Sequence, residues 1–471
     1  LYRKWIKNHN VNDLLNYKNY LKIYKAVVKQ CEDDYYKNVF TKCANNTKQV
    51  WQEINKIFSV SKANRKNKSF INKIIIDNKT LTDTTNICNA LNDYFCNVGE
   101  KIATYVGPCT ISFKKYLNNN ICKSVFLEPI CRQELLNTIN ELNLHKSAGP
   151  DEIGPKIIQD CKNRLINPLL FIFNLSFETG VFPSSLKIAK VIPIYKKGEK
   201  TSTGNYRPIS MLSIFDKILE KLMYRRIYNF LIKNNILFKY QFGFRKGHST
   251  TLALIEITDE LYKKMDENYY SMGIFLDLQK AFDSVNHSIL LEKLYNVGIR
   301  GPAYKWFSSY LSNRKQYVTI GGIKSEICNI NCGVPQGSVL GPLLFLVYVN
   351  DLQNSAPNTS IKLFADDTNV FLFQKNIDAL YASANEALQQ MNDWLKSNKL
   401  CVNVEKTQYI IFKKSNFVQT CDSHLSLHMN GKQILKVRSC KYLGITLDDK
   451  LSFIEHIDNL VAKIRKYCGI F

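Results

Sequence analysis

The pattern of apolar and polar positions predicts a chain that mixes long helices with short strands. Apolar residues recur every three to four positions over residues 377–394, which predicts an amphipathic helix. Residues 213–233 show the same period and predict a second helix. Residues 272–276 are continuously apolar, which predicts a strand buried on both faces. Strands alternate with helices in this way beyond residue 145, and this indicates an α+β fold.

Turn signals separate these elements. The triplet at 149–151 (GPD) predicts a turn, and Pro155 suits the first position of a helix. Residues 191–195 predict a strand that ends in the turn at 196–198 (KKG), and a helix over 288–296 is expected to close at Gly298. Residues 360–373 predict two strands around a tight central pair.

Residues 1–140 form a different part of the chain, rich in Asn, Lys and Tyr. Helical spacing appears in places, as in Trp51, Ile54, Ile57 and Phe58, so we expect a mainly helical N-terminal extension. This region carries no motif to which chemistry can be assigned. Its charge alone suggests that it helps to hold a nucleic acid.

The charge of the chain is strongly basic. Lys and Arg outnumber Asp and Glu by 64 to 40, a net charge of +24, which indicates a polyanionic partner. Between Lys190 and Thr250 there are 13 basic residues, with Lys196, Lys197, Arg225 and Arg226 among them, against three acids. Such a stretch predicts a track for backbone phosphates, although a solvated basic face without a ligand gives the same composition.

No apolar run approaches the length of a membrane span, since the longest, at 343–349, is flanked by Gly-Pro and Asn-Asp. The first residues do not form a signal peptide, so we expect a reducing compartment in which the 14 cysteines are ordinary thiols. The chain begins at Leu1 and ends at Phe471 in a helical pattern, and we therefore expect it to be part of a larger polyprotein.

Three acidic residues stand where carboxylates are costly to bury. Asp277 ends an apolar strand, and Asp366 and Asp367 occupy the bend of an apolar hairpin. Each feature alone is more often a helix cap or turn chemistry. Together, three acids from two neighbouring strands could hold two Mg²⁺ ions about 4 Å apart, the arrangement used for in-line phosphoryl displacement.

The order of further blocks makes that reading specific. Residues 145–450 resemble the fingers and palm of a non-LTR (LINE-type, jockey-like) retrotransposon reverse transcriptase. The blocks that carry the resemblance are 145–151 (HKSAGPD), 205–210 (NYRPIS), 241–249 (QFGFRKGHS), 275–283 (FLDLQKAFD), 333–342 (GVPQGSVLGP), 364–367 (FADD), 400–407 (LCVNVEKT) and 442–445 (YLGI).

The resemblance implies metal ligands and a proton donor. It assigns Asp277, Asp366 and Asp367 to two Mg²⁺ ions, with Mn²⁺ as a substitute, and the backbone carbonyl of Leu278 completes a coordination shell. It also makes Lys406 similar to the lysine that donates a proton to the departing pyrophosphate, although a lysine is more often a solvated charge.

The resemblance implies a nucleotide site as well. Lys190 and Arg207 match positions that hold the triphosphate, and Arg suits this because its planar fork binds phosphate oxygens in two places. Phe282 lies where the family places an aromatic ring beneath the sugar, which would exclude a ribose 2′-hydroxyl; it can also be a core residue, and the two roles are compatible. Gln336 and Gly337 belong to a turn that lies against the nucleotide and the template base.

Template and primer contacts are implied in two further blocks. Arg245 and Lys246 are placed near the template backbone, while Phe242 and Phe244 are expected to pack rather than stack on bases. The segment with Tyr442, Leu443 and Gly444 resembles the hairpin that grips the primer.

These assignments imply a right-hand polymerase fold and a division into three parts. We expect an N-terminal extension over 1–140, fingers and palm over 141–449, and the start of a truncated helical thumb over 450–471, where Phe453, Ile457 and Leu460 belong to an apolar stripe. The partners implied are template RNA, a DNA primer or target DNA, and dNTP, with no membrane and an undetermined oligomeric state. The compartment implied by the family is the nucleus.

Two alternatives stay open. Another reverse transcriptase lineage, such as a group II intron maturase, shares the acids but fits the block at 364–367 and the spacing less well. A decayed or domesticated copy would act only as an RNA-binding protein, and the intact acids count against it.

Overall fold

The computed structural model describes residues 1–44, 46, 49–54, 56, 71–107, 109–117, 121–413 and 425–468. The chain divides into two compact units, Leu1–Phe70 and Ile71–Phe471. Residues 71–140, which we assigned to the N-terminal extension, therefore group with the larger unit. Two members of the helical pattern in that extension, Ile57 and Phe58, lie outside the described residues.

The described residues of the first unit include the helices α1 (Tyr2–Asn8) and α2 (Val11–Cys43), and residues 49–54 are also helical. The side chain of Asn10 caps α2 by accepting a hydrogen bond from the backbone N–H of Asn12. Within α1 and α2 only Asp13 is buried, and it pairs with Lys4 at 3.5 Å. These helices therefore contribute almost no apolar core of their own.

The functional region of the second unit is built on a five-stranded sheet with the order β14-β11-β5-β10-β9. The bounds of its strands are β5 (Tyr270–Asp277), β9 (Ser360–Phe364), β10 (Asp367–Gln374), β11 (Gln408–Phe412) and β14 (Leu435–Lys436). The central strand β5 pairs antiparallel with both β10 and β11. Strands β9 and β10 pair antiparallel with each other, which confirms the predicted two-stranded hairpin over residues 360–373.

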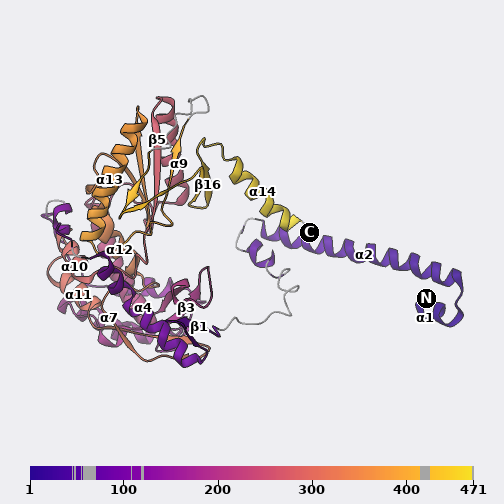
Figure 1. The fold of residues 1–471 in the computed structure, drawn as a ribbon. Coiled ribbons are helices and arrows are strands. Elements are labelled where there is room, and N and C mark those ends of the chain that lie inside the picture. Colours follow the sequence, from indigo (N-terminus) through magenta and orange to yellow (C-terminus); the bar gives the residue numbers. More distant parts are fainter. Residues whose placement is uncertain are drawn as a thin grey trace. The chain divides into compact units, whose positions relative to one another are not determined.

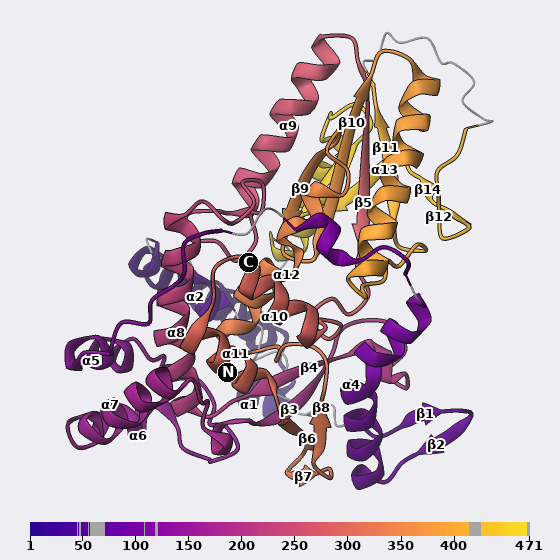
Figure 2. The same cartoon turned by 90° about the vertical axis from the view of Figure 1, so that its left-hand side faces the viewer.

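Helices cover both faces of this sheet, with α13 (Ile377–Ser397) and α9 (Thr250–Asp266) on opposite sides (Figures 1 and 2). Because side chains alternate along a strand, Met272 and Ile274 join the core on the α13 side, whereas Phe275 packs into the cluster that contains the buried face of α9. This explains the unbroken apolar run of β5, and its predicted burial on both faces is confirmed apart from partial exposure at Phe275.

A second sheet has the order β4-β3-β6-β7, with β8 also paired to β6. The bounds are β3 (Ile188–Tyr195), β4 (Tyr206–Met211), β6 (Arg314–Ile320), β7 (Ile323–Lys324) and β8 (Cys328–Ile330). Helix α4 (Thr84–Val106) packs on β6 through a core that includes Ile87 and Leu91, and β1 (Ile74–Ile76) and β2 (Lys79–Leu81) form a hairpin beside it.

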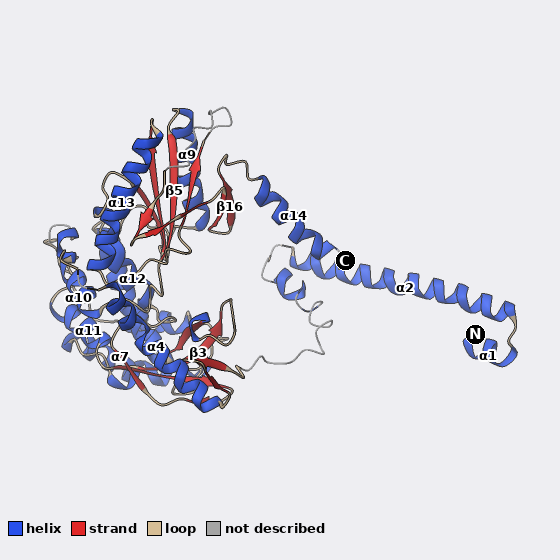
Figure 3. Cartoon of the chain, in the orientation of Figure 1, coloured by secondary structure: helices blue, strands red, loops and turns tan. Residues whose placement is uncertain are grey.

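Helices supply most of the core residues that do not belong to the two five-stranded sheets. Helices and strands alternate throughout the second unit (Figure 3). The α-helices are α5 (Arg132–Asn140), α6 (Pro155–Asp160), α7 (Lys162–Thr179), α8 (Ile214–Lys233), α10 (His287–Asn296), α11 (Gly301–Leu311), α12 (Leu340–Val349) and α14 (Ile454–Cys468). The 3₁₀ turns are η1 (Phe113–Tyr116), η2 (Ser184–Leu186), η3 (Thr203–Asn205) and η4 (Asn350–Asn354). Short hairpins are formed by β12 (His428–Met429) with β13 (Lys432–Gln433) and by β15 (Ser439–Tyr442) with β16 (Ile445–Asp448). The predicted α+β class is confirmed.

The caps and turns expected from the sequence are also present. Ser213 caps α8 by accepting from the N–H of Phe215, and Pro155 is the first residue of α6. Gly298, with a φ of 98°, follows α10 in the left-handed region, where glycine is favoured. The helix α14 keeps an apolar stripe exposed, with Ile457 53% and Ile464 50% accessible.

None of the helices among the described residues has the length and apolar character needed to cross a membrane.

Candidate active site

The end of the central sheet brings the predicted acidic residues together. Strand β5 ends at Asp277 and the antiparallel strand β10 begins at Asp367, and these two residues are directly paired. Asp366 precedes β10 in the tight turn after β9, in which Ala365 has a φ of 58°. Cross-strand neighbours have Cβ atoms about 5 Å apart, so the register alone places the two carboxylates side by side.

The turn that carries Asp366 is held by the block at 241–249. The buried Gln241 side chain accepts hydrogen bonds through Oε1 from the N–H groups of Gly243 and Ala365, at 2.8 and 3.1 Å. A Cβ on Gly243 would lie 2.2 Å from the backbone N of Ala365, so only glycine fits there. The sequence block therefore fixes the backbone that presents the acids.

The acids repel one another. Desolvation first, and then the Asp366 and Asp277 carboxylates, raise the pKa of Asp367 to about 6, while Lys196 opposes this rise. Asp367 is nevertheless exposed to solvent, so the contribution of desolvation is smaller than that of a fully buried acid. Lys406 Nζ lies 3.7 Å from Asp277 Oδ2 and partly compensates the charge. Among the described residues, no three acidic, His or Cys side chains are gathered into a preformed metal cluster.

Leu278 follows Asp277 and is bridged to Val402. The two hydrogen bonds of this bridge run from Asn403 N–H to the Asp277 carbonyl and from Gln279 N–H to the Cys401 carbonyl, both at 2.8 Å. The carbonyl of Leu278 itself takes no part in either bond, and Leu278 lines the cavity described next.

A cavity of about 650 Å³ is lined by residues from both five-stranded sheets of the second unit, and its volume is typical of ligand sites. The acidic residues Asp277 and Asp366 line it, and so do four basic residues, Lys196, Lys197, Arg207 and Lys406. Acidic and basic side chains thus line the same cavity. This combination suits a ligand that carries phosphate groups together with a metal ion.

Lys190 is not among the residues that line this cavity. It is paired with Met211 on β4, whereas Arg207 is paired with Ile194, four residues further along β3. Residues four apart on a strand share a face but are separated by about 13 Å. Of the two cations predicted to hold triphosphate, the structure therefore brings only Arg207 to the cavity, where Lys196 and Lys197 join it.

Phe282 also lines the cavity, and it packs into the core as well. Its ring stacks on Phe345 with centroids 4.6 Å apart, and Phe244 meets it edge-on at 6.0 Å. The two readings of this residue, a wall below the sugar and a packed core ring, are compatible with one another.

The predicted turn at 333–337 closes the cavity beside Phe282. Gln336 lines the cavity, and its Nε2 donates a hydrogen bond of 2.8 Å to Asp283 Oδ1. Gly337 has a φ of 131°, and a Cβ there would lie 2.5 Å from the carbonyl oxygen of Ser210. Glycine at 337 is therefore required by a close approach of two backbones.

Several cavity residues were missed by the sequence reasoning, chiefly Asp283, Lys280 and Tyr94. Lys280 Nζ donates to the carbonyls of Gly204 and Tyr206 at 3.0 and 3.2 Å, and it lies over the Tyr94 ring. Tyr94 belongs to α4, in a region without any recognisable motif. Asp283 belongs to the block at 275–283, and its position six residues after Asp277 is the signal that could have identified it as a residue of the site.

The two residues predicted to contact the template backbone, Arg245 and Lys246, lie in different environments. Arg245 directs its Nη1 to the carbonyls of Phe238, Lys239 and Gln241, so its guanidinium braces the local backbone. The side chain of Lys246 is exposed. Phe242 is buried, as expected for a packing residue, whereas Phe244 is 50% accessible.

The predicted primer hairpin is formed by β15 and β16. Leu443 and Gly444 make its turn with φ values of 45° and 93°, which is the geometry of a type I′ hairpin. Tyr442 is buried with its ring 5.5 Å from Phe275, and burial and the nearby Asp367 raise its pKa. The hairpin therefore adjoins the acidic end of the sheet.

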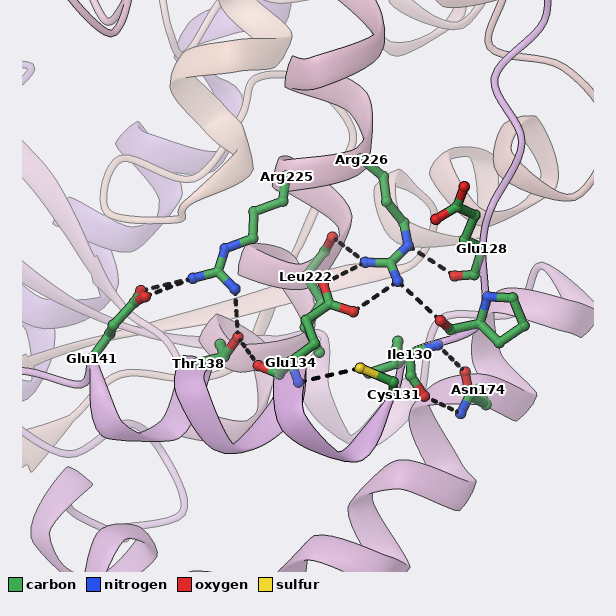
Figure 4. Close-up of polar contacts among 11 residues, drawn as sticks. Glu128, Ile130, Cys131, Glu134, Thr138, Glu141, Asn174, Leu222, Arg225 and Arg226 are labelled. Atoms are coloured by element: carbon green, nitrogen blue, oxygen red, sulfur yellow. Dashed lines mark hydrogen bonds and ion pairs between the residues drawn. The ribbon is translucent and has the colours of Figure 1, made fainter.

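Two arginines of the predicted phosphate track are instead paired with acids (Figure 4). Arg225 Nη2 contacts both carboxylate oxygens of Glu141, and Arg226 binds Glu134 through Nη1 and Nη2 at 2.8 and 2.9 Å. These pairs fasten α8 to α5. For Arg225 and Arg226 the interpretation as phosphate ligands is wrong, because partners roughly 90 residues away satisfy them.

Comparison with known proteins assigns this arrangement to a family. Residues 194–447 match the family described as reverse transcriptase (RNA-dependent DNA polymerase). The chain is 34% identical over 360 residues to the RNA-directed DNA polymerase from mobile element jockey of Drosophila melanogaster, covering 75% of this chain and 39% of that protein. It is 33% identical over 346 residues to a probable RNA-directed DNA polymerase from transposon BS of the same organism, covering 71% and 37%.

More distant similarity extends to type-1 elements. The chain is 26% identical over 348 residues to the Pol polyprotein of element R1 from Bradysia coprophila, covering 71% of this chain and 33% of that protein. The chain thus spans about two fifths of the length of the jockey and BS relatives. The predicted resemblance to jockey-like non-LTR elements is confirmed.

Proposed function

The chain belongs to the reverse transcriptase family, and on that premise we propose that it is the RNA-directed DNA polymerase of a non-LTR retrotransposon. Its reaction would be template-directed transfer of a dNTP to a primer 3′-hydroxyl. The observation that carries this proposal is the direct pairing of Asp277 with Asp367, together with a cavity that Asp277 and Arg207 both line.

The acidic end of the sheet suits a pair of Mg²⁺ ions, which prefer carboxylate and carbonyl oxygens. Asp277, Asp366 and Asp367 would hold them, with the Leu278 carbonyl as a further ligand and Mn²⁺ as a substitute. Desolvation and, after it, the charges of Asp366 and Asp277 raise the pKa of Asp367, and this supports the assignment because divalent cations would compensate these charges. When bound, the metals lower the pKa of the primer hydroxyl and neutralise charge on the leaving pyrophosphate.

The chain's own residues would then orient the substrate. Arg207, Lys196 and Lys197 bind the triphosphate. Lys190 lies on the same face of the sheet formed by β3 and β4, farther from the cavity, and its positive charge attracts the triphosphate over a longer distance. Lys406 is close enough to Asp277 to supply a proton to the departing pyrophosphate. Its 55% exposed side chain leaves it free to move.

The remaining contacts would select the nucleotide and hold the strands. Phe282 forms the floor below the sugar, and Gln336 and Gly337 flank the base. Lys246 contacts template backbone and Arg245 shapes the loop that presents it. The turn at Tyr442, Leu443 and Gly444 supports the primer end, because it adjoins Asp367.

These roles correspond to the right-hand arrangement of polymerases. The sheet of β5, β10 and β11 would be the palm, the sheet of β3, β4 and β6 would belong to the fingers, and α14 would begin the thumb. The partners would be template RNA, a DNA primer or target DNA, and dNTP, and the compartment would be the nucleus, where target DNA resides.

Primer extension on an RNA template with dNTP and Mg²⁺ tests the proposal. We expect cDNA synthesis by the unmutated chain, and Asp366→Ala should abolish it while RNA binding survives, because the loss of one acid removes a metal ligand without removing basic surface. RNA binding without extension by the unmutated chain would instead identify a domesticated RNA-binding protein.

A further inference from the structure

The backbone of Gln336 is fixed in place on one side by β4. Its carbonyl accepts a hydrogen bond of 2.8 Å from the N–H of Ser210. The next residue, Gly337, passes so close to Ser210 that no Cβ can be accommodated. The only freedom left to Gln336 is therefore in its side chain.

The segment that carries Asp283 is tied to the same turn. Val334 N–H donates to the Phe282 carbonyl at 2.9 Å, and Gly333 N–H donates to the Val285 carbonyl at 2.8 Å. A Cβ at Gly333 would lie 2.9 Å from Asp283 Cα, and one at Gly99 would lie 2.1 Å from the Asp283 carbonyl oxygen. Asp283 is thus clamped between the turn and α4, with its carboxylate facing Gln336.

We propose that Asp283 is a positioning residue that sets the amide orientation of Gln336. An ionised carboxylate only accepts hydrogen bonds, so the 2.8 Å contact requires the NH₂ group of Gln336 to face Asp283. The amide carbonyl of Gln336 is then the atom offered to the cavity. The site consequently presents an acceptor at this position, which selects a nucleotide or template group that donates a hydrogen bond.

The charged surroundings of Asp283 allow this role near neutral pH. Burial raises the pKa of Asp283 to about 6, and the Gln336 hydrogen bond and Lys280 oppose the rise. Tyr94 and Cys332 also sense its charge, and burial raises the pKa of both groups, so that they stay uncharged. Below pH 6 a protonated Asp283 could donate to the amide carbonyl, and the orientation would no longer be imposed.

The inference rests on the proposed polymerase function, and steady-state incorporation of one dNTP on an RNA template tests it. Asp283→Asn keeps the shape but can donate as well as accept, so we expect the KM for dNTP to rise roughly tenfold with a smaller change in kcat. In a Gln336→Ala background the same substitution should have no further effect, because its target is gone. Asp160→Asn is the control, because it makes the same chemical change at an exposed position on α6. Its KM for dNTP should equal that of the unmutated chain.

Additive effects of Asp283→Asn and Gln336→Ala would overturn the inference while leaving the polymerase assignment intact. Failure of the unmutated chain to extend a primer would overturn both. If Asp283→Asn does not fold, the pH dependence decides. Below pH 6 the KM of the unmutated chain should rise more steeply than that of Gln336→Ala, because the titration of Asp367, whose pKa is also about 6, affects both proteins alike. The same rise in both proteins would refute the role of Asp283.

Discussion

Among single residues, Phe282 offers the sharpest test of substrate choice. Its ring is stacked on Phe345 and cannot easily retreat from the cavity. Phe282→Ala should raise incorporation of ribonucleotides relative to deoxyribonucleotides by about 10- to 100-fold, because the space for a 2′-hydroxyl is opened. Competing incorporation of a dNTP and its matching rNTP measures this ratio. An unchanged ratio would show that Phe282 is only a core residue.

The ionisation of Asp283 should also make the free energy of unfolding depend on pH. Its folded pKa of about 6 lies above the ordinary value of 3.8, so folding favours the protonated form. The associated stability is complete below pH 4 and is lost as pH rises through 6. Relative to the unmutated chain, Asp283→Asn should therefore gain on the order of 1–3 kcal/mol in unfolding free energy between pH 4 and pH 7. Urea unfolding at several pH values measures the difference, and a constant difference would contradict the assigned burial.

The role of a single residue could be predicted when the residues that determine it lie close to it in the sequence. Asp277, Asp366 and Arg207 were identified because they lie in ordered blocks, and each reaches the cavity. Lys190 was expected there too, but strand register decides the distance, and register with β4 cannot be read from one strand. Arg225 has its carboxylate partner far away in the sequence, which a local count of charges does not detect.

Elements with strong periodicity were predicted well. The helix at 377–394 and the apolar strand at 272–276 are α13 and part of β5, because each buries a continuous face in the same core. Helix α4 was missed as a component of the site, although Ile87, Leu91 and Phe95 recur at helical spacing. Its role depends on packing against β6, a contact between segments more than 200 residues apart.

Helices α10 and α12 and the 3₁₀ turn η4 are joined by a buried ion pair. Lys293 of α10 lies 2.7 Å from Asp351 of η4 and also donates to the Tyr348 carbonyl of α12. Burial lowers the pKa of Lys293 and raises that of Asp351, so each charge depends on the other.

Lys293→Met should lower the free energy of unfolding by about 3–5 kcal/mol, because it leaves Asp351 buried without a partner. The surface pair of Lys264 with Glu267 provides the control, and Lys264→Met should leave the free energy of unfolding nearly unchanged. Denaturant unfolding followed by circular dichroism compares the two. Equal losses would show that the buried pair does not fasten these helices.

For the whole molecule, the second unit should fold without the first. Helices α1 and α2 bury no apolar side chain, so they contribute little to a shared core. A chain of residues 71–471 should therefore keep the thermal midpoint of the full chain within about 2 °C. Calorimetry of both chains gives the comparison, and a fall of more than about 8 °C would show that residues 1–70 are integral to the fold.

The central claim is that the paired strands β5 and β10 present a metal-dependent polymerase centre, and single-turnover incorporation of one dNTP on an RNA template tests it most directly. Asp277→Asn should slow this step by at least about 1,000-fold, since it removes charge where the metals act, whereas Asp160→Asn should leave the rate unchanged. A rate for Asp277→Asn within a few-fold of the unmutated chain would contradict the account.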